Sequence, residues 1–185
     1  MAGTVWALFW EGGLTGEIRA ALLGKLSPAD RAQYGTFPSG GRAGARGRQF
    51  LLSRALLAFA LEETLGTVPA LPGCFLSLSH TEGAALLALS DAPVGADIER
   101  VRPIPPRLGR DFAGREETFW RRWTAAEAAA KREGRGAGAL LPLGRRGFPE
   151  GPEARQLALR SGFAAALAGA GEFTIRTVTA EELAE

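Results

Sequence analysis

Three short apolar runs follow one another between residues 75 and 99, and they constrain the fold more than any other feature of the sequence. The runs are Phe75 to Ser79, Ala84 to Ser90 and Val94 to Glu99. The connections Thr81-Glu82-Gly83 and Asp91-Ala92-Pro93 have the composition of turns. Runs this short and this closely spaced are typical of strands, so the region predicts an antiparallel meander.

Helical signals occupy other parts of the chain. Residues 49–65 repeat apolar side chains at helical spacing and stop before Gly66, and residues 116–133 are rich in Ala, Glu and Arg and end at Gly134. Ser27 followed by Pro28 is a typical helix start, with serine as N-cap and proline at the first helical position. A core of helices and strands is therefore expected.

The segment Pro38 to Gly47 reads PSGGRAGARG, and its glycine and proline content predicts a mobile loop carrying Arg42, Arg46 and Arg48. Prolines 103, 105 and 106 predict a boundary between two subdomains, residues 1–99 and 100–185. Additional strands are expected at 4–10, 139–143, 156–160, 162–167 and 173–178.

Charge and composition limit the possible classes of partner. Residues 100–135 carry ten Lys or Arg against five Asp or Glu, a field that attracts anionic ligands or acidic proteins, although an ordinary solvated surface explains it too. No nucleic-acid motif accompanies the arginines, and no apolar run approaches the roughly 20 residues of a membrane span. The single cysteine, Cys74, fits a reducing compartment. We expect a cytoplasmic monomer that binds neither nucleic acid nor membranes.

Two carboxylates lie two residues apart in Val94 to Glu99. The strand period of two places Asp97 and Glu99 on one face and Ile98 on the other, toward the core. Such a pair would bind a hard divalent cation such as Mg²⁺ together with substrate phosphate oxygens. A solvated strand end is the alternative explanation.

A second candidate group lies in the helix of residues 116–133. Trp123, Glu127 and Lys131 are four residues apart and share one stripe of the helix. A surface ion pair between Glu127 and Lys131 would explain the spacing. However, only Lys25 and Lys131 are lysine among 22 basic residues, which favours a specific role for Lys131.

The only histidine, His80, follows Ser79 at the end of an apolar run. A histidine at a turn is free to meet a ligand, although a surface residue without a role is the alternative.

Taken in this order, the segments resemble the 4′-phosphopantetheinyl transferase superfamily, in its longer, two-subdomain surfactin type. The family pattern is Ser-His-Ser, then Gly-x-Asp-Ile-Glu, then Trp-x-x-Lys-Glu-x-x-x-Lys leading into Gly-x-Gly-Leu. Here the corresponding stretches are SHT, GADIE, WTAAEAAAK and EGRGAGALLPL. With RQFLLSRALL upstream, the resemblance covers roughly residues 48 to 143.

The resemblance implies an α+β fold of two similar subdomains with a pseudo-twofold relation, each a helix packed on a small antiparallel sheet. Coenzyme A would bind in the cleft between them. The implied activity is the transfer of its 4′-phosphopantetheine arm to a serine of an acyl or peptidyl carrier protein. The serine would attack the β-phosphorus and expel 3′,5′-bisphosphoadenosine.

The resemblance also assigns roles to residues. Asp97, Glu99 and Glu127 match the acids that hold Mg²⁺. Glu127 also matches the acid that helps to deprotonate the serine, and Lys131 matches the lysine that meets the leaving phosphate.

Coenzyme A contacts are assigned in the same way. Ser79 and His80 match phosphate-contacting positions, and we assign Arg48 to the 3′-phosphate of the nucleotide.

The sequence departs from the family at three places. Ala126 stands where lysine is usual, Thr81 replaces the second serine, and no Gly-Lys-Pro segment occurs between Gly66 and Phe75. Two other functions therefore stay open. One is a non-catalytic relative that binds coenzyme A or a carrier domain, and the other is a Mg²⁺-dependent phosphoesterase of unrelated fold.

Overall fold

The computed structural model describes most of the chain, in five stretches of residues. They are 2–38, 41–65, 73–106, 114–135 and 154–185. The predicted strand at 139–143 and the stretch 66–72, which bears on the missing Gly-Lys-Pro segment, lie outside them.

Four strands form the first sheet, in the order β2-β3-β1-β7. Their bounds are β1 (Ala2–Phe9), β2 (Phe75–Thr81), β3 (Ala84–Ser90) and β7 (Glu172–Val178). β3 pairs antiparallel with both β2 and β1, whereas β7 runs parallel to β1. All four strands are predicted by the sequence, and the β2–β3 hairpin is confirmed.

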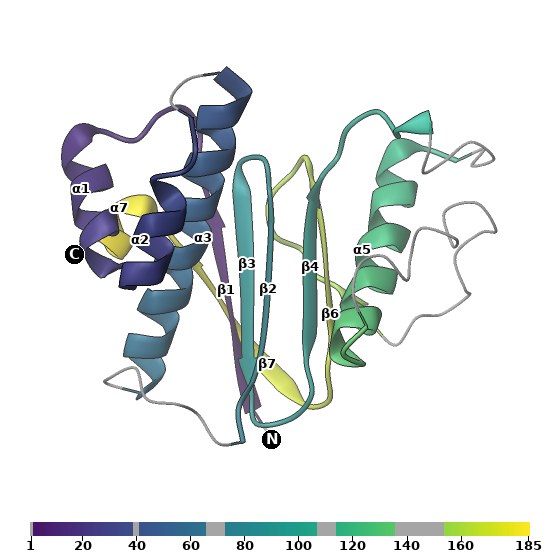
Figure 1. The fold of residues 1–185 in the computed structure, drawn as a ribbon. Coiled ribbons are helices and arrows are strands. Elements are labelled where there is room, and N and C mark those ends of the chain that lie inside the picture. The colour runs from purple at the N-terminus through teal and green to yellow at the C-terminus, as the bar shows by residue number, and fades with distance from the viewer. Residues whose placement is uncertain (1, 39–40, 66–72, 107–113, 136–153) are drawn as a thin grey trace.

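Helices cover one face of the first sheet (Figure 1). They are α1 (Gly16–Lys25), α2 (Pro28–Tyr34), α3 (Gly41–Leu65) and α7 (Ala180–Ala184). Ser27 caps α2 as predicted, because its side-chain oxygen accepts the main-chain N–H of the third helical residue. The apolar side chains of α3 provide most of the helical side of this core.

The loop predicted for Pro38 to Gly47 is wrong, because α3 begins at Gly41. Each glycine within a helix costs about 0.5–1 kcal/mol relative to alanine, which local sequence analysis counts against the helix. Tertiary packing offsets this cost. Gly47 is buried, and a Cβ there would lie 3.1 Å from Cβ of Phe37, so the small residue lets the preceding chain pack on α3.

Three strands form the second sheet, in the order β4-β6-β5. β4 (Gly95–Arg100) pairs antiparallel with β6 (Phe163–Ala168), and β6 pairs with the short β5 (Arg155–Gln156). The predicted meander is therefore wrong at its third strand. A meander requires β4 to pair with β3, but β2 and β1 already occupy both edges of β3.

Helix α5 (Glu116–Arg132) covers the outer face of the second sheet, as the sequence predicts for residues 116–133. Small side chains bring helix and sheet together, because Ala125 and Ala128 pack on Ala166 and Ala168. An aromatic cluster consisting of Phe119, Trp120 and Trp123 packs beside them. None of the helices in the described residues is both long and apolar enough to span a bilayer.

The two sheets pack against each other through their inner faces. Val5 and Leu86 of the first sheet share a core with Ile98 and Leu167 of the second. In Figure 1 the sheets lie between the α1, α2, α3 and α7 group and α5. The α+β class with two small sheets is thus confirmed. The pseudo-twofold relation and the division at residue 99 stay predictions.

Candidate functional site

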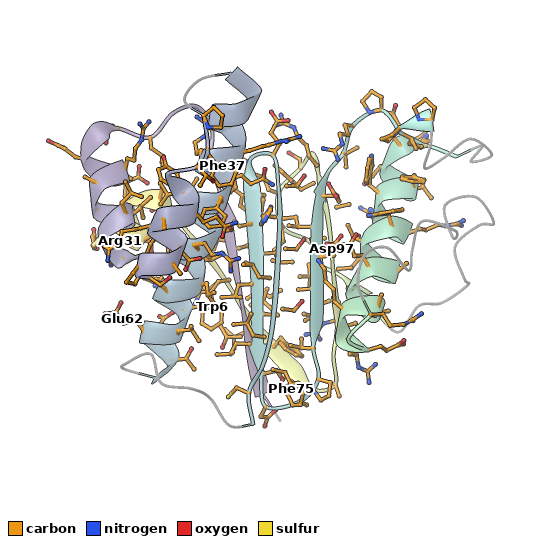
Figure 2. The ribbon with its side chains drawn as sticks, viewed as in Figure 1. Trp6, Arg31, Phe37, Glu62, Phe75 and Asp97 are labelled. Atoms are coloured by element: carbon orange, nitrogen blue, oxygen red, sulfur yellow. The ribbon has the colours of Figure 1, made fainter. Side chains whose placement is uncertain are left out.

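The predicted carboxylates lie on β4, the edge strand of the second sheet beside α5. Asp97 pairs across the strands with Ala166 and Glu99 with Ala164, so both point to the face that α5 covers. Ile98 points to the opposite face, into the core between the sheets. Figure 2 shows Asp97 between β4 and α5.

Gly95 explains how α5 approaches these carboxylates so closely. A Cβ at this position would lie 1.9 Å from the carbonyl oxygen of Ala128 and 2.6 Å from the main-chain nitrogen of Arg132. Only glycine fits there without moving the helix. The glycine of the Gly-x-Asp-Ile-Glu stretch therefore sets the distance between the strand acids and the side chains of α5.

Asp97 is buried, with its side chain 2% exposed, and one of its oxygens makes all the described contacts. Ser79 Oγ donates to Asp97 Oδ1 at 2.6 Å, and Lys131 Nζ donates to the same oxygen at 2.8 Å. The other oxygen, Oδ2, is buried without a hydrogen-bond partner among the described residues. A buried carboxylate oxygen without a partner is costly, so Oδ2 is available for a ligand.

Lys131 lies among oxygen atoms from both elements. Besides Asp97, its ammonium donates to the carbonyl of Ala96 at 3.2 Å and lies 3.5 Å from Glu127 Oε1. The Lys131 side chain is 23% exposed and that of Glu127 is 13% exposed. An exposed ion pair confined to the helix is therefore the wrong description, because β4 supplies the nearest contacts of Lys131.

The pKa values of Glu99 and Glu127 are both raised. Burial, followed by the negative charge of Asp97, raises the pKa of Glu99 to about 7. Burial and Asp97 also raise the pKa of Glu127, although Lys131 and a hydrogen bond from Trp123 act in the opposite direction. A cation close to these carboxylates would favour their ionised forms.

Thr81 and Arg102 both donate hydrogen bonds to Glu99, and the sequence predicted neither contact. Thr81 Oγ1 donates to Glu99 Oε2 at 2.9 Å, and Arg102 Nη2 donates to the same oxygen at 3.4 Å. Thr81 is only 4% exposed. The sequence predicted a turn beginning at Thr81, but β2 extends to this residue, so Thr81 shares a face of the strand with Ser79.

His80 lies next to Ser79 on β2 and points to α3. Its Nδ1 lies 2.7 Å from Nε2 of Gln49, a contact between residues 31 apart that the sequence did not predict. Partial removal of the ring from water lowers the pKa of His80, and the cations Lys131 and Arg54 lower it further. A neutral imidazole beside two cations is suited to accept a proton when an anion binds.

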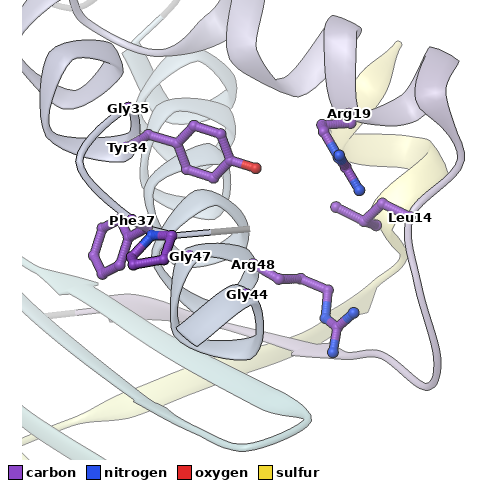
Figure 3. Close-up of a pocket in the computed structure, with 9 residues that line it drawn as sticks. Leu14, Arg19, Tyr34, Gly35, Phe37, Gly44, Gly47 and Arg48 are labelled. Atoms are coloured by element: carbon purple, nitrogen blue, oxygen red, sulfur yellow. The ribbon is translucent and has the colours of Figure 1, made fainter. Parts of the chain in front are cut away.

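Arg48 precedes Gln49 on α3 and lines a cavity of about 310 Å³. Figure 3 shows Tyr34 and Phe37 on one side of this cavity and Arg19 on the other. Nε of Arg48 is buried without a hydrogen-bond partner among the described residues. The cavity thus combines aromatic rings with two guanidinium groups, a lining that suits a planar anionic ligand.

The described residues contain no group of three or more His, Cys, Asp or Glu side chains already arranged around a metal position. The Lys131 ammonium contacts both Asp97 and Glu127. Nevertheless, the donors fit a hard cation. They are carboxylate oxygens, Asp97 Oδ2 has no partner, and the pKa of Glu99 is raised to about 7.

Comparison with known proteins gives two relatives of the same type. The chain is 27% identical to the 4′-phosphopantetheinyl transferase Sfp of Bacillus subtilis (strain 168), over 52% of this chain and 49% of the relative. It is also 27% identical to the 4′-phosphopantetheinyl transferase ffp of Bacillus subtilis, over 51% and 48%. No protein-family model matches the chain.

The match spans about half the length of both curated relatives. The resemblance to the 4′-phosphopantetheinyl transferase superfamily, Sfp type, is confirmed by these two relatives.

Proposed function

We propose that this chain transfers the 4′-phosphopantetheine arm of coenzyme A to a serine of an acyl or peptidyl carrier protein, with Mg²⁺ as cofactor. The observation that carries the proposal is the convergence of Asp97, Glu127 and Lys131. Asp97 and Lys131, 34 residues apart in the chain, meet at 2.8 Å in a part-buried contact, and the second oxygen of Asp97 has no hydrogen-bond partner among the described residues. The GADIE motif supplies Asp97 to this cluster, and the WTAAEAAAK motif supplies Glu127 and Lys131.

Asp97, Glu99 and Glu127 are the residues that would hold Mg²⁺. The bound ion would neutralise the charge of the coenzyme A pyrophosphate. Burial and the negative charge of Asp97 raise the pKa of Glu99, so both disfavour its ionised form. A bound cation would offset the repulsion between Asp97 and Glu99, and this gain would favour Mg²⁺ binding.

Proton transfer is assigned to the residues of α5. The raised pKa of Glu127 suits a base that takes the proton of the attacking serine. The serine oxygen forms a bond to the β-phosphorus, and the bond from that phosphorus to the bridging oxygen breaks. Lys131, an ammonium on a flexible stem, would donate to the departing phosphate oxygen.

Coenzyme A would extend from this cluster toward α3. His80, Arg48 and the aromatic cavity beside Arg48 provide contacts for the anionic and planar parts of the nucleotide. A phosphate contact from Ser79 stays a prediction, since in this structure its hydroxyl donates to Asp97 Oδ1.

Ala126 bears on the alternative of a binding protein without activity. Its side chain is 5% exposed and packs in the aromatic cluster with Phe119 and Trp123. At the position of the usual lysine before Glu127, this chain therefore has a core residue without a positive charge. The proposed transferase relies on Lys131 and His80 instead.

Mass spectrometry tests the proposed transfer. Apo acyl and peptidyl carrier domains are incubated with the protein, coenzyme A and Mg²⁺, and each carrier is weighed. Addition of one phosphopantetheine mass that requires Mg²⁺ supports the proposal, and Glu127→Gln should abolish the gain. An unmodified panel with wild-type protein would contradict it.

Two controls separate the alternatives. Coenzyme A that raises the melting temperature without any carrier modification indicates the binding relative. Release of phosphate from simple esters without protection by coenzyme A indicates the phosphoesterase.

A further inference from the structure

Three hydroxyl side chains alternate along β2 and point to the second sheet. Ser77, Ser79 and Thr81 are 6%, 7% and 4% exposed, respectively, so all three are buried. The residues between them point the other way or to solvent, and Leu78 packs in the core under α3. We call these three residues the hydroxyl seam.

Each hydroxyl of the seam accepts a main-chain N–H from β4. The N–H of Ala96 donates to Ser77 Oγ at 2.8 Å, and that of Ile98 donates to Ser79 Oγ at 3.4 Å. The N–H of Arg100 donates to Thr81 Oγ1 at 3.4 Å. The donor lies 19 residues after the acceptor in all three pairs, so β2 and β4 run side by side in constant register.

The seam thus joins the edge strands of two separate sheets. β2 is an edge strand of the first sheet and β4 is an edge strand of the second. The side-chain oxygens of β2 accept N–H groups of β4 that would otherwise need a main-chain partner on a neighbouring strand. Removal of any one hydroxyl leaves a β4 N–H without that acceptor.

The hydroxyl protons of the seam have different acceptors. Ser77 donates to the carbonyl of Ala96 at a long 3.5 Å, whereas Ser79 donates to Asp97 Oδ1 at 2.6 Å and Thr81 to Glu99 Oε2 at 2.9 Å. Bonds to ionised acceptors are shorter and about twice as strong as neutral ones. Two members of the seam therefore hold carboxylates, and the third holds only main chain.

Both carboxylates are fixed through a single oxygen. Lys131 shares Asp97 Oδ1 with Ser79, and Arg102 shares Glu99 Oε2 with Thr81. The second oxygen of each takes no part in these contacts, and Asp97 Oδ2 has no hydrogen-bond partner among the described residues. A carboxylate anchored by one oxygen has lost the rotational freedom that cation binding would otherwise cost.

We propose that Ser79 and Thr81 are positioning residues that fix Asp97 and Glu99 for a divalent cation, while the whole seam joins the two sheets. The inference rests on the proposed function in one respect, that these carboxylates bind Mg²⁺. It gives Ser79 a role independent of coenzyme A. It also gives a role to Thr81, which stands where the family has a second serine and which contacts Glu99.

The test compares Ser79→Ala and Thr81→Val with the matched control Ser77→Ala. All three variants lose one acceptor for a β4 N–H, so their melting temperatures without metal should all fall. Calorimetric titration of the metal-free proteins with Mg²⁺ should separate them. The Kd should rise about 10–100-fold in Ser79→Ala and Thr81→Val, as is typical for residues that orient metal ligands, and stay at the wild-type value in Ser77→Ala.

Conservative variants complete the test. Ser79→Thr and Thr81→Ser keep a hydroxyl and should restore Mg²⁺ binding. If Ser79→Ala does not fold, Thr81→Val at the end of the seam and its Thr81→Ser rescue test the same proposal. Equal Mg²⁺ affinity in all variants, equal losses in all three including Ser77→Ala, or no Mg²⁺ binding by the wild type would overturn it.

The readout also separates this inference from the proposed function. Mg²⁺ affinity is measured without coenzyme A or a carrier protein. If the variants differ as expected but the wild type modifies no carrier, the positioning role stands and the transferase proposal fails.

Discussion

At the level of single residues, the Lys131 ammonium lies close to oxygen atoms from both β4 and α5. It has Asp97 Oδ1 at 2.8 Å, the Ala96 carbonyl at 3.2 Å and Glu127 Oε1 at 3.5 Å. A planar guanidinium is larger and a weaker acid. The chain uses arginine at 20 of its 22 basic positions, since only Lys25 and Lys131 are lysine, and this scarcity favours a specific role for Lys131.

Lys131→Arg should therefore lower the rate of carrier modification at saturating coenzyme A by about 10²-fold or more, because proton donation to the leaving phosphate is impaired. Coenzyme A binding should change less. Lys25→Arg, at the only other lysine, is the matched control and should keep the wild-type rate. Near-wild-type turnover of Lys131→Arg would remove Lys131 from the proposed mechanism.

Glu99 gives the metal-free protein a characteristic pH dependence. Its pKa is about 7 in the folded protein against an ordinary 4.5, so between these values the folded state binds more protons than the unfolded state. The free energy of unfolding should then fall as pH rises through this window. Ionisation of the partly exposed Glu99 should lower it by on the order of 2 kcal/mol, and this loss is complete above the folded-state pKa.

Urea denaturation in the presence of a chelator, from about pH 5 to about pH 8, measures this effect. Glu99→Gln should flatten the profile and raise stability at the upper end, because the replacement cannot ionise. Mg²⁺ added to the wild type should likewise raise its free energy of unfolding at the upper end of the pH range. Parallel profiles for wild type and Glu99→Gln would show that Glu99 is not the titrating group.

At the level of elements, the spacing of α5 and β4 depends on Gly95. In Gly95→Ala the new Cβ would meet the Ala128 carbonyl at 1.9 Å, and neither backbone segment can yield without a shift of the helix. We expect a loss of about 1–3 kcal/mol or more in unfolding free energy. Mg²⁺ binding should weaken too, since Glu127 lies on the displaced helix.

Gly24→Ala is the control for this variant. Gly24 lies in α1, where a Cβ would meet nothing within 4 Å, so alanine should be neutral or stabilising by up to about 1 kcal/mol. Chemical denaturation of both variants measures the difference. A Gly95→Ala protein as stable as Gly24→Ala would show that α5 and β4 tolerate a wider separation.

At the level of the whole molecule, the uneven charge should affect encounter with a carrier protein. Residues 100–135 carry ten basic against five acidic side chains, and Arg102, Arg115, Arg121 and Arg122 are exposed. With an acidic carrier, catalytic efficiency should fall as salt rises, mainly through slower association. Stopped-flow association rates over a range of ionic strength check this. A flat response would leave the arginines as ordinary surface.

The sequence by itself determined the local conformation of most elements. The start of α2 at Ser27 and Pro28, the course of α5 and the common face of Asp97 and Glu99 all depend on neighbours within a few residues. Capping and periodicity report such short-range effects directly. The motif order likewise indicated which acids and which lysine are candidates for one site, and the fold brings Asp97, Glu127 and Lys131 together.

Only the tertiary structure decided which elements and side chains meet. β4 pairs with β6 and not with β3, whose two edges are taken, and β7 returns from the end of the chain to pair with β1. The seam from β2 to β4 and the contact of Gln49 with His80 join residues 18 to 31 apart. A local pattern fixes a strand's two faces, but its pairing partner depends on which other edges remain free, and that is a property of the whole fold.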